Sequence, residues 1–114
     1  MKKQFRIKKT EEIETVLKER KIVSGKNFVV YKKENHENTH YRFALSVPKK
    51  FGNAVLWNKM KRRIRAIVRS QNLINGVDFF VVAKANSNTA DFNELNKELI
   101  YLFKKAQLLE ENNE

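Results

Sequence analysis

The chain has 114 residues, of which 41% are apolar, and it carries a formal net charge of +11 at pH 7. This length and apolar content support one core, so we expect residues 1–114 to form a single domain, and no apolar run approaches the roughly 18 residues that cross a bilayer. The absence of cysteine excludes disulfides, thiolate nucleophiles and Cys-ligated zinc, and is compatible with the cytoplasm, where we expect the protein to be located.

The N-terminal part of the chain predicts one helix. Residues 1–9 are basic but lack the apolar stretch of a secretory signal, so we expect the mature protein to start near its first residue. Thr10 as N-cap, with Glu11 and Glu12 in the first turn, predicts a helix over residues 11–20.

Two strands are predicted next. The run F-V-V-Y is β-branched and aromatic and predicts a strand over residues 27–32. Residues 41–47 alternate apolar and polar side chains, as a half-buried strand does, and Pro48 ends that strand. The polar loop over residues 33–39 joins the two, so we expect them to form an antiparallel hairpin.

A long basic helix and a third strand follow. Asn53 is a good N-cap, and we expect the helix to run over residues 53–73 and to stop at Asn75-Gly76. The apolar residues 77–83 predict a strand buried on both faces. A strand, a long helix and a further strand form a crossover, so part of the sheet should be parallel.

The C-terminal part of the chain predicts a last helix. Residues 86–89 are polar and read as a loop, whereas residues 92–106 carry apolar side chains at helical spacing. We expect residues 110–114 to be a frayed acidic tail.

The basic helix carries most of the functional information. Between Arg42 and Val77 the sequence contains nine Lys or Arg and no Asp or Glu. At about 100° per residue, one helix face carries cationic or amide side chains: Asn58, Lys61, Arg62, Arg65 and Arg69. The opposite face is apolar and should pack on the core: Leu56, Met60, Ile64, Ile67 and Val68.

No motif for bond cleavage stands out. His36-Glu37-Asn38-Thr39-His40 fits H-E-x-x-H, which in metalloproteases requires a rigid helix, whereas this stretch lies in a predicted polar loop. A zinc hydrolase using His36, Glu37 and His40 therefore stays only as a rival hypothesis. We expect no catalytic residue and no metal ligand in the protein.

The basic face instead predicts an anionic partner. Like charges at i,i+3 and i,i+4 repel each other by a few tenths of a kcal/mol per pair, and a bound anion would reverse this effect. The Arg guanidinium can donate two hydrogen bonds to one phosphate group. Aromatic side chains such as Tyr31 and Trp57 could stack on unpaired bases, which favours RNA or single-stranded nucleic acid as the partner. Binding to a membrane surface is a weaker alternative, because the apolar face should be covered by the sheet.

The sequence around this helix resembles the bacterial ribonuclease P protein subunit, the small basic partner of a catalytic RNA that removes the 5′ leader from precursor tRNA. Residues 46–66 read S-V-P-K-K-F-G-N-A-V-L-W-N-K-M-K-R-R-I-R-A, and the family signature is approximately S-V-x-K-K-x-G-x-A-V-x-R-N-x-x-K-R-x-x-R-E. The likeness extends outward to R-I-K-K before the first helix and to the F-V-V-Y strand, so it covers nearly the whole chain.

The resemblance implies an α/β fold, an α+β sandwich of the kind also found in a ribosomal protein domain, with a left-handed crossover around the basic helix. It implies two partners, ribonuclease P RNA and precursor tRNA, with Mg²⁺ held mainly by the RNA, and neither a membrane nor a small-molecule substrate. By position, the residues expected to face the catalytic RNA are Lys49, Lys50, Asn53, Asn58, Lys61, Arg62, Arg65 and Arg69. Those expected to line a cleft for the leader are Ile13, Leu17, Tyr31 and Arg42.

The sequence departs from the family pattern at several positions. Trp57 stands where the family has an Arg and Ala66 where it often has Glu, and Ile13 and Leu17 stand where it tends to have aromatic residues. Trp57 could stack on RNA or pack against the sheet. The alternative function is that of a ribosomal-type RNA-binding protein without a processing role.

Overall fold

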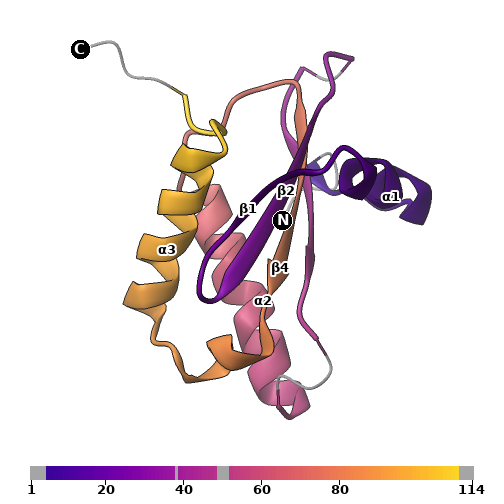
Figure 1. Cartoon of the computed structure of the whole chain (residues 1–114). Helices are drawn as coiled ribbons and strands as arrows, with labels where there is room; N and C mark the ends of the chain where they lie inside the picture. Colours follow the sequence, from indigo (N-terminus) through magenta and orange to yellow (C-terminus); the bar gives the residue numbers. More distant parts are fainter. Residues whose placement is uncertain (1–4, 38, 49–51, 111–114) are drawn as a thin grey trace.

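The computed structural model describes residues 5–37, 39–48 and 52–110 (Figure 1). They form three α-helices, one 3-10 helix and four strands, in the order α1 (Thr10–Lys18), β1 (Lys21–Ser24), β2 (Phe28–Glu34), β3 (Arg42–Ser46), α2 (Ala54–Arg69), β4 (Val77–Ala83), η3 (Ala85–Thr89) and α3 (Phe92–Lys105). The predicted α+β architecture is confirmed. In the described residues, no helix is both long enough and apolar enough to cross a membrane.

The strands form one mixed sheet in the order β1-β2-β4-β3. β3 and β4 run parallel, with α2 between them in the chain, as the crossover pattern predicted. The expected hairpin of residues 27–32 with 41–47 is wrong, because β4 lies between β2 and β3 and is antiparallel to β2. β4 lies between β2 and β3 because it is the most apolar strand, and an interior strand of this sheet is covered on both faces.

The actual hairpin partner of β2 is β1, which the sequence did not predict. The backbone N–H of Gly25 donates to the Phe28 carbonyl at 2.8 Å and closes this hairpin. β1 is only four residues long and mostly exposed, so its sequence lacks the apolar alternation that marks a strand.

The two faces of the sheet differ in how they are covered. On one face, α2 and α3 enclose the main core, which contains the rings of Phe28, Phe43, Phe79 and Phe103. On the other face, α1 packs on β2 and β4 and buries Val16 completely. Figure 1 shows α1 and α3 on opposite sides of the sheet.

The helix boundaries follow the capping residues with two corrections. Asn53 caps α2, since its side chain accepts a hydrogen bond from the Leu56 N–H at 3.0 Å. Thr10 is the first residue of α1, and its predicted role as N-cap is wrong, because Lys9 occupies that position without a side-chain bond. α2 ends at Arg69, before the predicted Leu73. Leu73 is instead buried in the core and forms an antiparallel bridge with Leu109.

The predicted loop and tail also contain more structure than expected. The stretch expected as a polar loop forms η3. Beyond α3, Leu108 is fully buried, and the backbone N–H of Glu110 donates to the Asn72 carbonyl at 2.8 Å. Burial of Leu108 therefore holds the chain against the core up to Glu110, and the rest of the predicted tail lies outside the described residues.

Candidate nucleic-acid interface

Helix α2 separates an apolar face from a cationic one, as the sequence predicted. Four side chains of the apolar face are buried: Met60, Ile64, Ile67 and Val68. Leu56 was expected beside them but is 41% exposed, because it lies in the first turn, where the helix extends beyond the sheet (Figure 1).

The opposite face of α2 presents its charges without neutralising partners. We call this surface the cationic face, and its members are Asn58, Lys61, Arg62, Arg65 and Arg69. Asn58, Arg62 and Arg69 are exposed, and Lys61 and Arg65 are half-buried. Within the described part of the chain, no carboxylate forms an ion pair with a Lys or Arg of α2. The positive charge of this helix therefore remains available to an anion.

Trp57 packs at the edge of the cationic face. Its indole N–H donates to the Val47 carbonyl at 2.7 Å, and its half-buried ring contacts the core. Lys61 places its Nζ atom 3.4 Å from the centroid of the Trp57 ring, a cation–π contact. Of the two roles that the sequence left open for Trp57, the structure thus shows packing against the core, with a hydrogen bond to the residue that follows β3.

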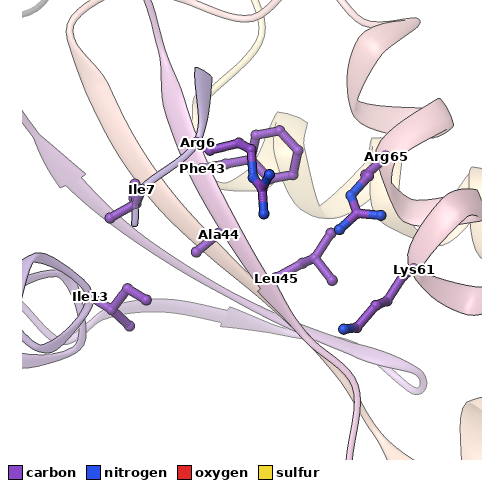
Figure 2. A pocket seen from close by; sticks show the side chains of 8 residues that line it. All are labelled: Arg6, Ile7, Ile13, Phe43, Ala44, Leu45, Lys61 and Arg65. Carbon is purple, nitrogen blue, oxygen red and sulfur yellow. The ribbon is translucent and has the colours of Figure 1, made fainter. Parts of the chain in front are cut away.

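A cavity of about 180 Å³ lies where residues 6 and 7 meet β3 and α2 (Figure 2). Lys61 and Arg65 line it from α2, and Arg6 lines it from the segment before α1. Its remaining lining residues are apolar: Ile7, Ile13, Phe43, Ala44 and Leu45. Burial, followed by the charges of Arg65 and Arg6, lowers the pKa of Lys61. Because three cations and no acidic residue line the cavity, its electrostatic potential is positive.

The surface expected to bind a leader strand lies on the α1 side of the sheet. Tyr31 of β2 and Phe80 of β4 are paired in register and half-buried, with ring centroids 6.2 Å apart. Ile13 and Leu17, one turn apart on α1, are also half-buried. Ile13 in addition lines the cavity with Lys61 and Arg65, so the two predicted RNA surfaces meet there.

Arg42 has two carboxylate partners. Its guanidinium donates to both carboxylate oxygens of Asp78, at 3.1 and 2.9 Å, and forms an ion pair with Glu12 of α1. Asp78 is buried and also accepts from the Asn35 amide at 3.0 Å. The hydrogen bond to Asp78, as the largest effect, raises the pKa of Arg42 above its usual value. This side chain ties α1 to the sheet.

The remaining predicted residues occupy other positions. Lys49 and Lys50 lie outside the described residues. Asn53 is exposed and uses its side-chain oxygen to cap α2. The described residues of the H-E-x-x-H stretch, His36, Glu37, Thr39 and His40, lie in the connection between β2 and β3 and not on a helix. There His40 Nδ1 lies 2.9 Å from the Tyr41 carbonyl oxygen, and no group of three potential metal ligands occurs among the described residues.

Two residues of these surfaces were not identified from the sequence. The sequence predicts Phe80 in a strand buried on both faces, whereas the structure leaves it half-buried between the buried Phe79 and Val81, and the uniformly apolar run 79–83 gives no signal for this difference. Arg6 belongs to a basic run whose place in the fold depends on the parallel bridge between Arg6 and Phe43, and no local pattern indicates that bridge.

A strongly basic α+β domain with an unpaired cationic helix face has the electrostatic features that are typical of nucleic-acid-binding proteins. Residues 1–107 match the model of the family Ribonuclease P. The ribonuclease P protein component of Streptococcus pneumoniae (strain Hungary19A-6) is 40% identical over 115 residues, covering 99% of this chain and 93% of that protein. The chain belongs to the ribonuclease P protein family, and is thus a subunit of an endoribonuclease of tRNA processing.

Solved structures agree with this assignment. A mutant of the Staphylococcus aureus RNase P protein with defective mRNA degradation activity is 34% identical and superposes with a TM-score of 0.88, over 94% of this chain and 92% of that one. The RNase P protein from Thermotoga maritima is 27% identical and superposes with a TM-score of 0.78, over 88% of this chain and 96% of that one.

Proposed function

We propose that this protein binds ribonuclease P RNA through the cationic face of α2 and assists removal of the 5′ leader from precursor tRNA. The observation that carries the proposal is the unpaired charge of that face, displayed by a helix whose other side is anchored in the core. Guanidinium groups bind phosphate bidentately, and Asn58 adds a donor and an acceptor. Family membership supports the choice of this RNA as partner.

The second part of the proposal concerns the leader. Tyr31 and Phe80 provide a half-exposed aromatic pair on β2 and β4, the two strands on which α1 packs, and unpaired bases stack on such rings. Arg42 supports this surface indirectly, because its ion pairs with Glu12 and Asp78 fix α1 on the sheet. Contact with the leader would favour precursor over mature tRNA, since only the precursor carries a leader.

We assign no step of the hydrolysis to the protein, and we propose that the Mg²⁺ ions are held by the RNA. The carboxylates of Glu12 and Asp78 lie close to each other but both pair with the Arg42 guanidinium. These oxygens are already neutralised and do not fit a divalent cation. The chain's own residues act by binding and orienting RNA and by reducing phosphate repulsion.

A cleavage assay at low Mg²⁺ tests this function. Catalytic RNA alone should cleave precursor tRNA poorly, and addition of the protein should restore removal of the 5′ leader. RNA affinity should also fall steeply with salt, because about 4 to 6 phosphate contacts give a log–log slope of roughly −3 to −5. No stimulation of cleavage would refute the proposal and would leave the ribosomal-type RNA-binding protein as the better account.

A further inference from the structure

A second cavity lies between α2 and the segment that joins η3 to α3. Its volume of about 230 Å³ is several times the roughly 30 Å³ that one water occupies in the liquid. Figure 1 shows η3 beside the first half of α2. One wall of the cavity is formed by α2, with Leu56, Lys59, Met60 and Arg63, and the opposite wall includes Ala90 and Asp91. Among the described residues, this cavity and the one beside β3 share no lining residue.

The two walls of this cavity carry opposite charges that do not pair with each other. Lys59 and Arg63 lie on the α2 wall and Asp91 on the opposite wall, and within the described part of the chain neither cation forms an ion pair with Asp91. Asp91 caps α3, where its Oδ1 atom accepts from the Glu94 N–H at 2.8 Å. A carboxylate has about four lone-pair sites, so Asp91 can still accept hydrogen bonds from a ligand.

The surface between these charges is apolar and suits a flat ring. Met60 is buried beneath the cavity, and Leu56 is partly exposed at it. The Phe92 side chain follows Asp91 and is 39% exposed, and the Arg63 guanidinium carbon lies 6.0 Å from the centroid of its ring. The ring therefore lies at the edge of the cavity. Aromatic rings and guanidinium planes are the surfaces on which unpaired nucleobases stack.

We infer that this cavity binds a guanine nucleotide through the Phe92 ring, the Asp91 carboxylate and the Arg63 guanidinium. The ring stacks on the base, the carboxylate accepts from the Watson–Crick edge of the base, and the guanidinium binds the phosphate with Lys59 beside it. The inference goes beyond the RNA binding proposed above, because it does not involve the cationic face and applies equally to a free nucleotide.

The chemistry of Asp91 selects guanine among the four bases. The Watson–Crick edge of guanine carries two adjacent donors, N1–H and the N2 amino group, which match the two oxygens of one carboxylate. Adenine and cytosine present a donor beside an acceptor at this edge, and uracil presents one donor between two acceptors. Only guanine therefore donates two parallel hydrogen bonds to Asp91.

The first experiment titrates the ¹⁵N-labelled chain with 5′-GMP, and with 5′-UMP at equal ionic strength. Both nucleotides carry the same phosphate, so a difference between them reports on the base. We expect 5′-GMP to shift the amide signals of Leu56, Asp91 and Phe92 and to bind about 10-fold more tightly than 5′-UMP, the gain expected for a hydrogen bond to a charged group. 5′-IMP lacks the N2 amino group and should lose most of this preference.

Three variants test the roles of the side chains. Asp91→Asn keeps the helix cap, because Asn caps a helix as well as Asp does, and it should abolish the preference for 5′-GMP over 5′-UMP. The matched control is Glu94→Gln, which removes a charge from the same turn of α3 at a residue that does not line the cavity. The readout is the ratio of the two affinities, because removal of a negative charge acts on both nucleotides alike. Arg63→Gln should weaken 5′-GMP binding about 10-fold and leave the binding of guanosine, which has no phosphate, unchanged.

Three results would overturn the inference. They are equal affinities for 5′-GMP and 5′-UMP, signal shifts confined to the cationic face of α2, and the same affinity ratio in Asp91→Asn as in Glu94→Gln.

The second experiment distinguishes a free nucleotide from a nucleotide of an RNA chain. It compares the affinities of a uridine hexamer and of the same hexamer with one central guanosine. A gain from guanosine that Asp91→Asn removes assigns the cavity to an unpaired guanosine of RNA, whereas selectivity for 5′-GMP without such a gain assigns it to a free guanine nucleotide. The absence of base selectivity in both experiments would refute the site. The RNA binding proposed for the cationic face would then still stand, because it rests on phosphate contacts.

Discussion

The ion pairs of Arg42 lead to a prediction about stability that separates a structural role from direct RNA contact. The Arg42 and Asp78 side chains are only 20% and 5% exposed. Arg42→Met keeps the apolar stem of the side chain but removes the guanidinium that neutralises the buried Asp78 carboxylate, which still accepts a hydrogen bond from the Asn35 amide. Breaking a buried ion pair in this way costs about 3 to 5 kcal/mol. The Glu12 side chain is 33% exposed, so its lost pair adds at most about 1 kcal/mol.

We therefore expect Arg42→Met to lower the free energy of unfolding by about 3 kcal/mol in urea titrations at pH 7. Asp78→Leu should cost less, about 2 kcal/mol, because Arg42 retains its pair with Glu12. The double variant should be more stable than the sum of the two losses implies, by about 2 kcal/mol, since it removes the buried carboxylate together with its guanidinium partner. Arg62→Met on the exposed face of α2 is the control and should stay within about 0.5 kcal/mol of the wild type.

Two results would refute this account. One is additivity of the two single losses, which would mean that the two side chains do not depend on each other. The other concerns RNA: if Arg42 acts by fixing α1, Glu12→Gln, which removes the pair with α1 and keeps Arg42, should weaken leader binding about as much as Arg42→Met. Leader affinity that falls in Arg42→Met but is kept in Glu12→Gln would instead assign Arg42 a direct contact with the leader.

Two further predictions concern α2. Lys61→Met should leave stability in the absence of RNA within about 0.5 kcal/mol of the wild type, because relief of the repulsion by Arg65 and Arg6 is offset by loss of the cation–π contact with Trp57. RNA affinity should fall about 10-fold. Since the pKa of Lys61 is lowered in the folded state, wild-type stability should rise with pH toward the usual 10.5 relative to that of the variant; a difference between the two that does not change with pH in urea titrations would contradict this. Trp57→Phe should lower stability by about 1 kcal/mol through loss of the bond to the Val47 carbonyl, with RNA affinity in a filter-binding assay within about 3-fold. A much larger loss of affinity would indicate that Trp57 stacks on RNA.

The family and the two-faced helix were predictable from the sequence. The spacing of Met60, Ile64, Ile67 and Val68 reflects a period of 3.6 residues, which is set by local backbone geometry alone. The signature of residues 46–66 is likewise a linear pattern. The parallel crossover was also predictable, because a long helix between two strands allows it.

Strand order could not be obtained in the same way. Residues 27–32 and 41–47 are neighbours in the sequence with a loop between them, which favours a hairpin, yet β4 pairs with both β2 and β3. The choice depends on which strand gains most by being covered on both faces, a comparison over the whole sheet. β1 was missed for a related reason, since pairing with β2 stabilises a segment of weak intrinsic pattern.

The sequence by itself determined that this protein presents a cationic helix face over an apolar one, because both follow from side chains a turn or less apart. Only the tertiary structure decided what its other charges do. The parallel register of β3 and β4 sets Arg42 beside Asp78 and makes it a link to α1. The bridge between Arg6 and Phe43 brings Arg6 to Lys61 and Arg65. Electrostatic energy depends on distance in space, and the fold sets that distance.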